Sequence, residues 1–258
     1  MFTFEDAYAS KFYFDRYRMQ QKYWFHWHYN ILEAVIKNAY ISQQANVYAA
    51  NHRIKNILDM GCGTGHVSRF LAQTHRCNSF GFDPNSNYKI KLLNLKFNLK
   101  AEIRRYDCRT KIKRETHAEF FASNKIRFDI IIDNCSVTHF DTQKHEDVNA
   151  GWDFIVRELP KHLSENGIFI SATDVVYPEK VNSEFCKEAD ILETFKVHGW
   201  QIDNLNHMYR SKEFESITDN FIKFKDLDFI RVPPPKAADG AALGIMGMVA
   251  RPQKISVS

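Results

Sequence analysis

The stretch NILDMGCGTGHVSRF, residues 56–70, decides the fold, because it joins an apolar run to a glycine-rich turn and then to a segment with helical spacing. Such a strand, turn and helix present unpaired backbone N–H groups to a ligand, and the glycines let the ligand approach closely. Dinucleotide-binding turns have the spacing G-x-G-x-x-G. Here the glycines are Gly61, Gly63 and Gly65, and the sixth position is His66. The spacing therefore disfavours NAD as the ligand.

Apolar runs and helical segments alternate along the rest of the chain. The runs expected to form strands are 53–60, 78–84, 101–107, 127–134, 164–174, 200–210 and 241–252. The helical patterns between them cover 66–75, 87–97, 115–123, 150–163 and 184–198. Strands separated by helices are typical of crossover units in a parallel sheet. The first fifty residues also have a helical pattern, and 211–240 is too long for a hairpin and is expected to be an insertion.

Composition restricts the class of protein. A chain of 258 residues with 44% hydrophobic and 26% charged residues suits one α/β domain with an extension. Its five cysteines contain no C-x-x-C pair, which indicates reduced thiols and no metal site. No apolar run is long enough for a membrane helix, so we expect a cytoplasmic protein without membrane attachment.

The net charge of +4 is mildly basic, with its densest run at 104–117. We interpret this run as a solvated loop and helix face. A surface for an anionic substrate or a nucleic acid is the alternative.

Four motifs, ILDMGCGTG, GFDPN, RRYDCR and FDIIIDN, occur in that order and resemble the motif series of the class I S-adenosylmethionine-dependent methyltransferase superfamily, small-molecule type. The resemblance covers mainly 53–174. It implies an α/β Rossmann-like fold with a seven-stranded, mostly parallel sheet, an antiparallel last strand at 241–252, and helices on both faces. The expected organisation is an N-terminal helical cap or lid at 1–52 and a methyltransferase core at 53–258, with the insertion at about 211–240.

The resemblance also implies S-adenosylmethionine as the cofactor. The residues expected to hold it are Asp59, Gly61, Cys62, Gly63, Gly65, Asp83, Pro84, Asp107, Cys108 and Asn134. Asp83 would accept hydrogen bonds from both ribose hydroxyls, because a carboxylate only accepts; helix capping is its alternative role. Asp59 would face the methionine ammonium, directly or through water, or serve a plain structural role.

Three further positions would complete this cofactor site. Asp107 is expected to follow the third strand and receive the adenine amino group, with a solvated loop as the alternative. Cys108 would contribute its backbone. The carbonyl of Asn134, after the fourth strand, would line the reactive sulfonium.

The acceptor side has weaker candidates. His139 follows the fourth strand and can take a proton near neutral pH, with Asp141 to orient it, although a structural His139 is the competing interpretation. The segment 8–30 is rich in aromatic residues, which could form a lid with Tyr17 over the site or fill a packing or dimer interface. Because direct methyl transfer needs no covalent step, Cys135 is not expected to act as a nucleophile.

The sequence therefore predicts methyl transfer to an oxygen or nitrogen of a small-molecule metabolite. The chain lacks the D/N-P-P-Y tetrapeptide of amino-directed DNA methyltransferases and a Pro-Cys pair after the fourth strand. Two alternatives stay open: an RNA or other nucleic-acid methyltransferase, and a non-catalytic partner protein that binds S-adenosylmethionine. A homodimer is also left open.

Overall fold

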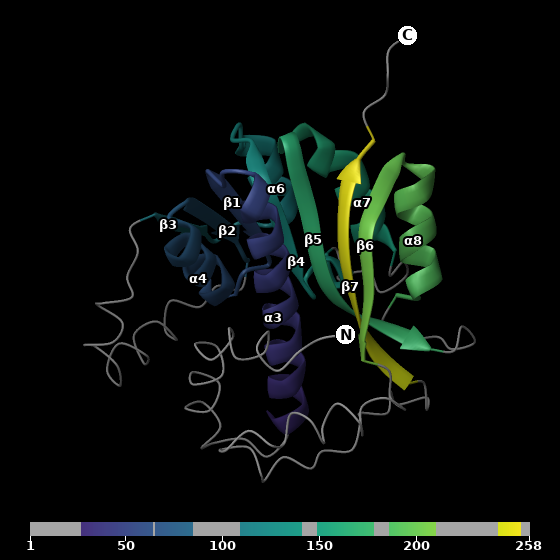
Figure 1. Cartoon of the computed structure of the whole chain (residues 1–258). Helices are drawn as coiled ribbons and strands as arrows, with labels where there is room; N and C mark the ends of the chain where they lie inside the picture. The colour runs from purple at the N-terminus through teal and green to yellow at the C-terminus, as the bar shows by residue number, and fades with distance from the viewer. Residues whose placement is uncertain are drawn as a thin grey trace.

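The computed structural model describes residues 27–63, 65–84, 109–140, 149–177, 186–209 and 242–253. These residues form a seven-stranded sheet in the order β3-β2-β1-β4-β5-β7-β6 (Figure 1). The strands are β1 (Asn56–Met60), β2 (Asn78–Phe82), β3 (Thr110–Lys113), β4 (Phe128–Asn134), β5 (Leu163–Tyr177), β6 (Trp200–Tyr209) and β7 (Ala242–Pro252). β7 runs antiparallel to β5 and β6, whereas the pairs among β1 to β5 are parallel. The predicted fold class is confirmed.

Helices cover both faces of the sheet (Figure 1). One face carries α3 (Trp27–Asn51) and α4 (His66–His75); the other carries α6 (His117–Ser123), α7 (Ala150–Glu158) and α8 (Glu188–Val197). Two short 3₁₀ turns, η2 (Val137–His139) and η3 (Leu159–Lys161), follow β4 and α7. Among the described residues, no helix is both long and apolar enough to cross a membrane.

The central strands are apolar on both faces because both faces are covered. In β4, Ile130 and Ile132 pack toward α3 and α4, while Ile131 packs toward the opposite helices. All three are fully buried. This arrangement explains why the strand is a continuous apolar run instead of an alternating pattern.

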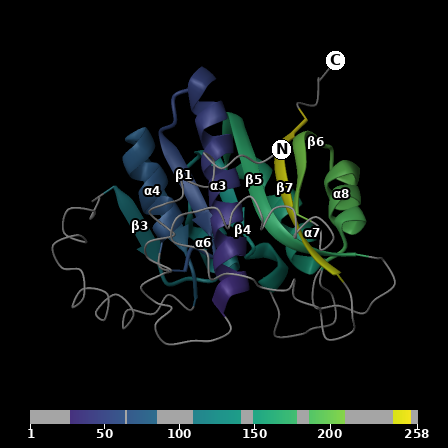
Figure 2. The same ribbon diagram turned by 60° about the horizontal axis from the view of Figure 1, so that its bottom comes forward.

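Helix α3 lies along the sheet and extends past the edge at which β4 ends (Figures 1 and 2). Tyr40 and Ile41 are fully buried in the same core cluster as residues of β4 and β5. A Cβ atom on Gly247 of β7 would lie 2.7 Å from carbons of the Tyr40 ring, so the glycine permits close packing of the helix. The helix expected in the cap is therefore present, and it shares the core of the sheet. The proposed boundary after residue 52 stays a prediction.

The third strand differs from the sequence prediction. It is formed by Thr110–Lys113, whereas the predicted strand, 101–107, lies outside the described residues. Asp107 precedes this strand in the chain, and its role at the adenine stays a prediction. The apolar pattern did not point to Thr110–Lys113, because an edge strand needs little apolar content and only Ile112 of TKIK is aliphatic.

The same finding changes the interpretation of the basic run at 104–117. Part of it is this edge strand, with Lys111 and Lys113 exposed, so it is not only a loop and helix face. The ammonium groups of these lysines lie 5.9 Å from the Phe80 ring centroid and 5.6 Å from the Phe120 ring centroid, respectively. Lys113 also pairs with Glu115 at 3.2 Å.

Candidate active site

The glycine turn after β1 has an unusual backbone conformation. Gly61, Gly63 and Gly65 have φ values of +58°, +52° and +72°, a region that glycine occupies at little cost. Gly65 is the N-cap of α4, and no side chain caps this helix. The turn therefore leads directly into a helix start, where backbone N–H groups and the positive end of the helix dipole favour a polar ligand.

Asp83 follows β2 and closes one side of this turn. Its Oδ2 accepts a hydrogen bond from the backbone N–H of Gly63 at 2.8 Å, and its own N–H donates to the Lys113 carbonyl at 3.1 Å. The N–H of Cys62 donates to the Phe82 carbonyl at 3.0 Å. Because a carboxylate can accept about four hydrogen bonds, Asp83 can serve this turn and a ligand together.

Asp59 lies beneath the turn, on the face that α4 covers. Its side chain is 2% exposed, and its Oδ2 accepts from the Ser68 hydroxyl at 2.5 Å. Burial raises the pKa of Asp59 to about 7, and the neighbouring charges of Asp133 and Asp83 add to the rise, while the Ser68 hydrogen bonds oppose it. A cationic ligand group placed here would favour the charged form of the carboxylate.

A fully buried carboxylate, Asp133, organises the segment after β4. Its Oδ1 accepts from the backbone N–H groups of Ser136 and Val137 at 2.7 and 3.0 Å, and its Oδ2 accepts from the Ser171 hydroxyl at 2.8 Å. The Ser136 hydroxyl lies 2.7 Å from the Met60 carbonyl oxygen and 2.8 Å from Asp133 Oδ1. The segments after β1 and β4 are therefore joined through Ser136.

Asp133, Ser136 and Ser68 were not among the site residues expected from the sequence. A usable signal for the first two was present: an Asp whose side chain accepts from backbone N–H groups a few residues later is a common way to shape a turn. Ser68 had no such local signal, because its partner lies nine positions earlier in the chain.

The structure brings most of the predicted cofactor residues together. Around the turn lie Asp59, Gly61, Cys62, Gly63, Gly65, Asp83 and Pro84. Asn134 ends β4, the strand next to β1, and its Nδ2 donates to Asn38 Oδ1 on α3 at 2.8 Å. The carbonyl of Pro84 accepts from Arg114 Nε at 3.1 Å. Burial raises the pKa of the Cys62 thiol, which suits a backbone role for this residue.

The structure does not test the positions of the remaining predicted residues. Tyr17, Asp107, Cys108 and Asp141 lie outside the described residues. His139 is the last residue of η2, and the structure describes its backbone only. Its neighbour Thr138 is buried, with its hydroxyl 3.4 Å from that of Thr173 on β5.

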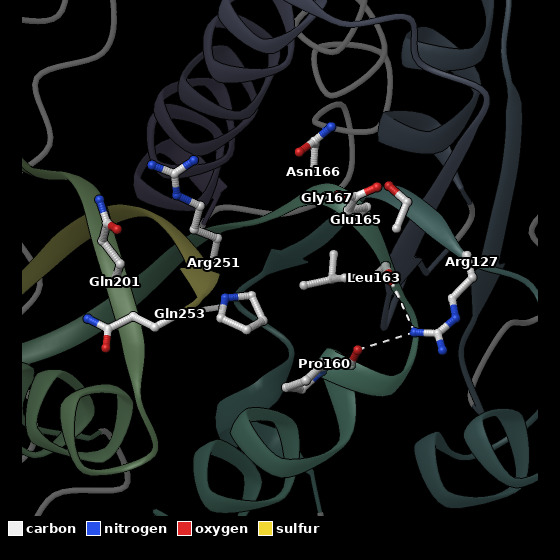
Figure 3. A pocket seen from close by; sticks show the side chains of 11 residues that line it. Arg127, Pro160, Leu163, Glu165, Asn166, Gly167, Gln201, Arg251 and Gln253 are labelled. Carbon is white, nitrogen blue, oxygen red and sulfur yellow. Dashed lines mark hydrogen bonds between the residues drawn. The ribbon is translucent and has the colours of Figure 1, made fainter. Parts of the chain in front are cut away.

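A cavity of about 650 Å³ lies at the opposite edge of the sheet, where β4 and β5 begin and β7 ends (Figure 3). None of the predicted site residues lines it. Arg127 in its wall donates to the carbonyls of Pro160 and Leu163 at 3.3 and 3.2 Å. The cavity is therefore separate from the glycine turn.

Comparison with known proteins agrees with the geometry of the turn. The family model of the methyltransferase domain matches residues 31–221, more than half of the 258-residue chain. No curated protein sequence matches the chain.

Several solved structures share the fold. A methyltransferase from Geobacter sulfurreducens, crystallised with S-adenosylhomocysteine, has a TM-score of 0.53 at 13% identity, over 83% of this chain and 90% of its own. A methyltransferase from Thiobacillus denitrificans, also with S-adenosylhomocysteine, has a TM-score of 0.52 at 11% identity, over 83% and 91%. The [4+2]-cyclase SpnF has a TM-score of 0.51 at 14% identity, over 83% and 80%. Since the cyclase has the same fold, these similarities establish the fold and not the reaction.

The family match decides the class. The chain belongs to the methyltransferase domain family and is an S-adenosylmethionine-dependent methyltransferase of the class I fold. The predicted enzyme class and the predicted cofactor, S-adenosylmethionine, are confirmed.

Proposed function

We propose that this methyltransferase transfers the methyl group of S-adenosylmethionine to an oxygen or nitrogen atom of a small-molecule metabolite. The glycine turn, Asp83 and Asp59 hold the ribose and methionine parts of the cofactor in this proposal. Asn134 then lies one strand further along the sheet, so the acceptor would enter over the ends of β4 and β5.

The observation that supports a small acceptor best is the segment after β4. Amino-directed DNA enzymes carry an aromatic residue in a D/N-P-P-Y motif here, whereas residues 133–136 of this chain are DNCS. Ser136, at the aromatic position, is buried and hydrogen-bonded to β1 and Asp133, and the next residue, Val137, is fully buried in the core. No aromatic ring at these positions could stack on an extruded base.

The charges near the site agree with this choice. The basic residues of β3 lie over aromatic rings or pair with Glu115, and such placement does not form the concentrated basic surface that nucleic-acid binding needs. A small-molecule partner, a cytoplasmic setting and the absence of membrane attachment stay part of the proposal, and a homodimer stays open.

Methyl transfer depends mainly on how the acceptor and the cofactor methyl group are positioned relative to each other. Holding two reactants in line can supply on the order of 7–11 kcal/mol of the barrier, whereas a general base supplies roughly 3–5 kcal/mol. In our proposal His139, at the end of η2, is the residue placed to accept a proton from an alcohol, with Asp141 orienting it and Tyr17 closing the site. A neutral amine acceptor would need this help less.

The test is to incubate the protein with S-adenosylmethionine labelled in its methyl group, a small-molecule extract and total RNA, and then to separate the fractions. The proposal expects label in the small-molecule fraction and none in RNA. The variant Asp83→Ala in parallel controls for transfer by contaminants. Label confined to RNA would overturn the proposed substrate class.

A further inference from the structure

The α3 face of the sheet changes from apolar to polar at the edge where the parallel strands end. Alternate residues of a strand point to the same face. The last apolar residues of this face on β1, β4 and β5 belong to one core cluster: Ile57, Ile132 and Ala172. Two positions further on, the same strands carry Asp59, Asn134 and Asp174. Asp59 and Asn134 belong to the proposed cofactor site, and Asp174 is the residue of the three without an assigned role.

Asp174 forms a buried ion pair with helix α3. Its Oδ2 lies 2.8 Å from Lys37 Nζ, and the two side chains are 9% and 2% exposed. A buried ion pair must recover the cost of removing two charges from water, so it is weak evidence for stability alone. The residue next to Lys37, Asn38, accepts a hydrogen bond from the Asn134 side chain. Helix α3 is therefore attached to the ends of both β4 and β5 by polar contacts.

The same carboxylate oxygen also contacts the residue after β4. The thiol of Cys135 donates to Asp174 Oδ2 at 2.9 Å. Cys135 has a φ of +55°, one of two such non-glycine residues in the described part of the chain. A side chain in this region costs conformational energy, and such residues persist where surrounding contacts hold them, often at functional sites.

We infer that Lys37, Asp174 and Cys135 form a positioning cluster. Lys37 fixes the Asp174 carboxylate, and this carboxylate fixes the Cys135 thiol. The thiol in turn keeps the left-handed turn that orients the Asn134 carbonyl toward the cofactor methyl group. The inference rests on the proposed cofactor site. It adds the three residues of the cluster, which act through the backbone carbonyl of Asn134. The cluster controls the geometry at the methyl group and not the affinity for the cofactor.

The experiment compares two substitutions of Cys135 with one substitution of the Asp174 carboxylate. Glycine adopts a positive φ freely, so Cys135→Gly keeps the turn without the thiol, whereas Cys135→Ala loses the thiol and keeps the strain. The probe is S-adenosylmethionine with a ¹³C-labelled methyl group, whose bound resonance reports the surroundings of the methyl group without an acceptor. We expect Cys135→Ala and Asp174→Asn to shift this resonance and Cys135→Gly to leave it unchanged. The Kd for S-adenosylhomocysteine should stay within about threefold of wild type in all three.

Matched controls separate this role from folding. Asp153→Asn removes the carboxylate of an exposed ion pair with Arg157 (3.0 Å) and should change neither readout. If Asp174→Asn fails to fold because the buried Lys37 ammonium loses this carboxylate, the double variant Lys37→Met with Asp174→Asn removes both charges and should show the same shift. An unchanged methyl resonance in Cys135→Ala, or a loss of S-adenosylhomocysteine affinity above tenfold with the resonance intact, overturns the inference. Failure of the wild-type protein to bind S-adenosylhomocysteine would instead overturn the cofactor site itself.

Discussion

The carboxylate of Asp83 accepts a hydrogen bond from the backbone N–H of Gly63 across 2.8 Å, which joins the end of β2 to the glycine turn after β1. The two residues are twenty positions apart in the chain, and parallel pairing of β1 with β2 brings them together. The contact fixes the carboxylate at the edge of the sheet, where a ribose would lie. Gly63 and Asp83 belong to two different sequence motifs, separated in the chain by α4, and together they lie on one side of the proposed cofactor site.

Substitution of Asp83 should weaken cofactor binding. Asp83→Ala removes the acceptor for both ribose hydroxyls, and we expect at least a tenfold loss of S-adenosylhomocysteine affinity, or about 1.4 kcal/mol. Asp83→Asn can still accept from Gly63 and should lose less. Titration calorimetry measures both variants. Wild-type affinity in Asp83→Ala would remove Asp83 from the ribose site.

The glycines of the turn should differ in what they tolerate. A Cβ atom on Gly61 would lie 2.3 Å from Ser136 Cβ, and Ser136 is held by Asp133 and β1, so Gly61→Ala combines backbone strain with overpacking. Gly63 has no atom within 4 Å of such a Cβ and would bear the strain alone. We expect Gly63→Ala to lower the free energy of unfolding by about 1–2 kcal/mol and Gly61→Ala by about 2–5 kcal/mol.

Urea denaturation of the two glycine variants measures this difference. Gly63→Ala should keep the fold and lose affinity for S-adenosylhomocysteine, because its new methyl group occupies the ligand side of the turn. Equal stability of the two variants would mean that Ser136 does not constrain Gly61.

Cofactor binding should depend on pH through Asp59. Because burial raises the pKa of Asp59 to about 7, the free protein holds a proton there at pH 5–6 that must leave when the ligand ammonium arrives. Affinity for S-adenosylhomocysteine should therefore rise with pH, by up to about tenfold per unit, and level off above about pH 7.

The raised pKa of Asp59 also makes the free energy of unfolding depend on pH, in the direction opposite to that of cofactor affinity. Between the ordinary pKa of 3.8 and about 7, the folded protein binds a proton that the unfolded chain has released. The contribution of Asp59 to the free energy of unfolding therefore falls as pH rises across this window and is constant above it. Calorimetry from pH 5 to 8 tests the binding dependence, with Asp59→Asn as the control. An identical pH dependence in Asp59→Asn would assign the effect to another group.

Most of the fold was predictable from the sequence, because apolar runs report burial directly. β4 is a continuous apolar run since both of its faces are covered, and α4 was predicted at 66–75, the bounds that the structure shows. β3 could not be recognised in the same way. It is an edge strand of four residues, and its two lysines are exposed, with their ammonium groups over aromatic rings.

The residues of the candidate site were predictable where they belong to a short sequence motif with characteristic spacing. The glycines and Asp83 follow from the motif, and Asp59 from its position two residues before Gly61. The contacts of Asp174 could not be anticipated, because its partner Lys37 lies 137 positions away in helix α3. Only the packing of α3 on the sheet brings them together.

The buried ion pair should show strong coupling between its members. Lys37→Met removes the Lys37 ammonium from the buried Asp174 carboxylate, and we expect a loss of about 3–5 kcal/mol in the free energy of unfolding. Addition of Asp174→Asn to this variant should recover part of the loss, because both charges are then absent. Urea denaturation of the single and double variants measures the coupling. A double variant as unstable as the sum of the two singles would show that the pair is not coupled.

The most direct test of the cofactor site is a thermal melt of the wild-type protein with S-adenosylhomocysteine and, separately, with NAD. A ligand at about one hundred times its Kd stabilises a protein by about 2.7 kcal/mol, which raises the Tm of a domain of this size by roughly 5–10 °C. The structure predicts this rise with S-adenosylhomocysteine and none with NAD. A rise with NAD alone, or with neither ligand, would contradict the assignment of the glycine turn and Asp83 to an adenosyl cofactor.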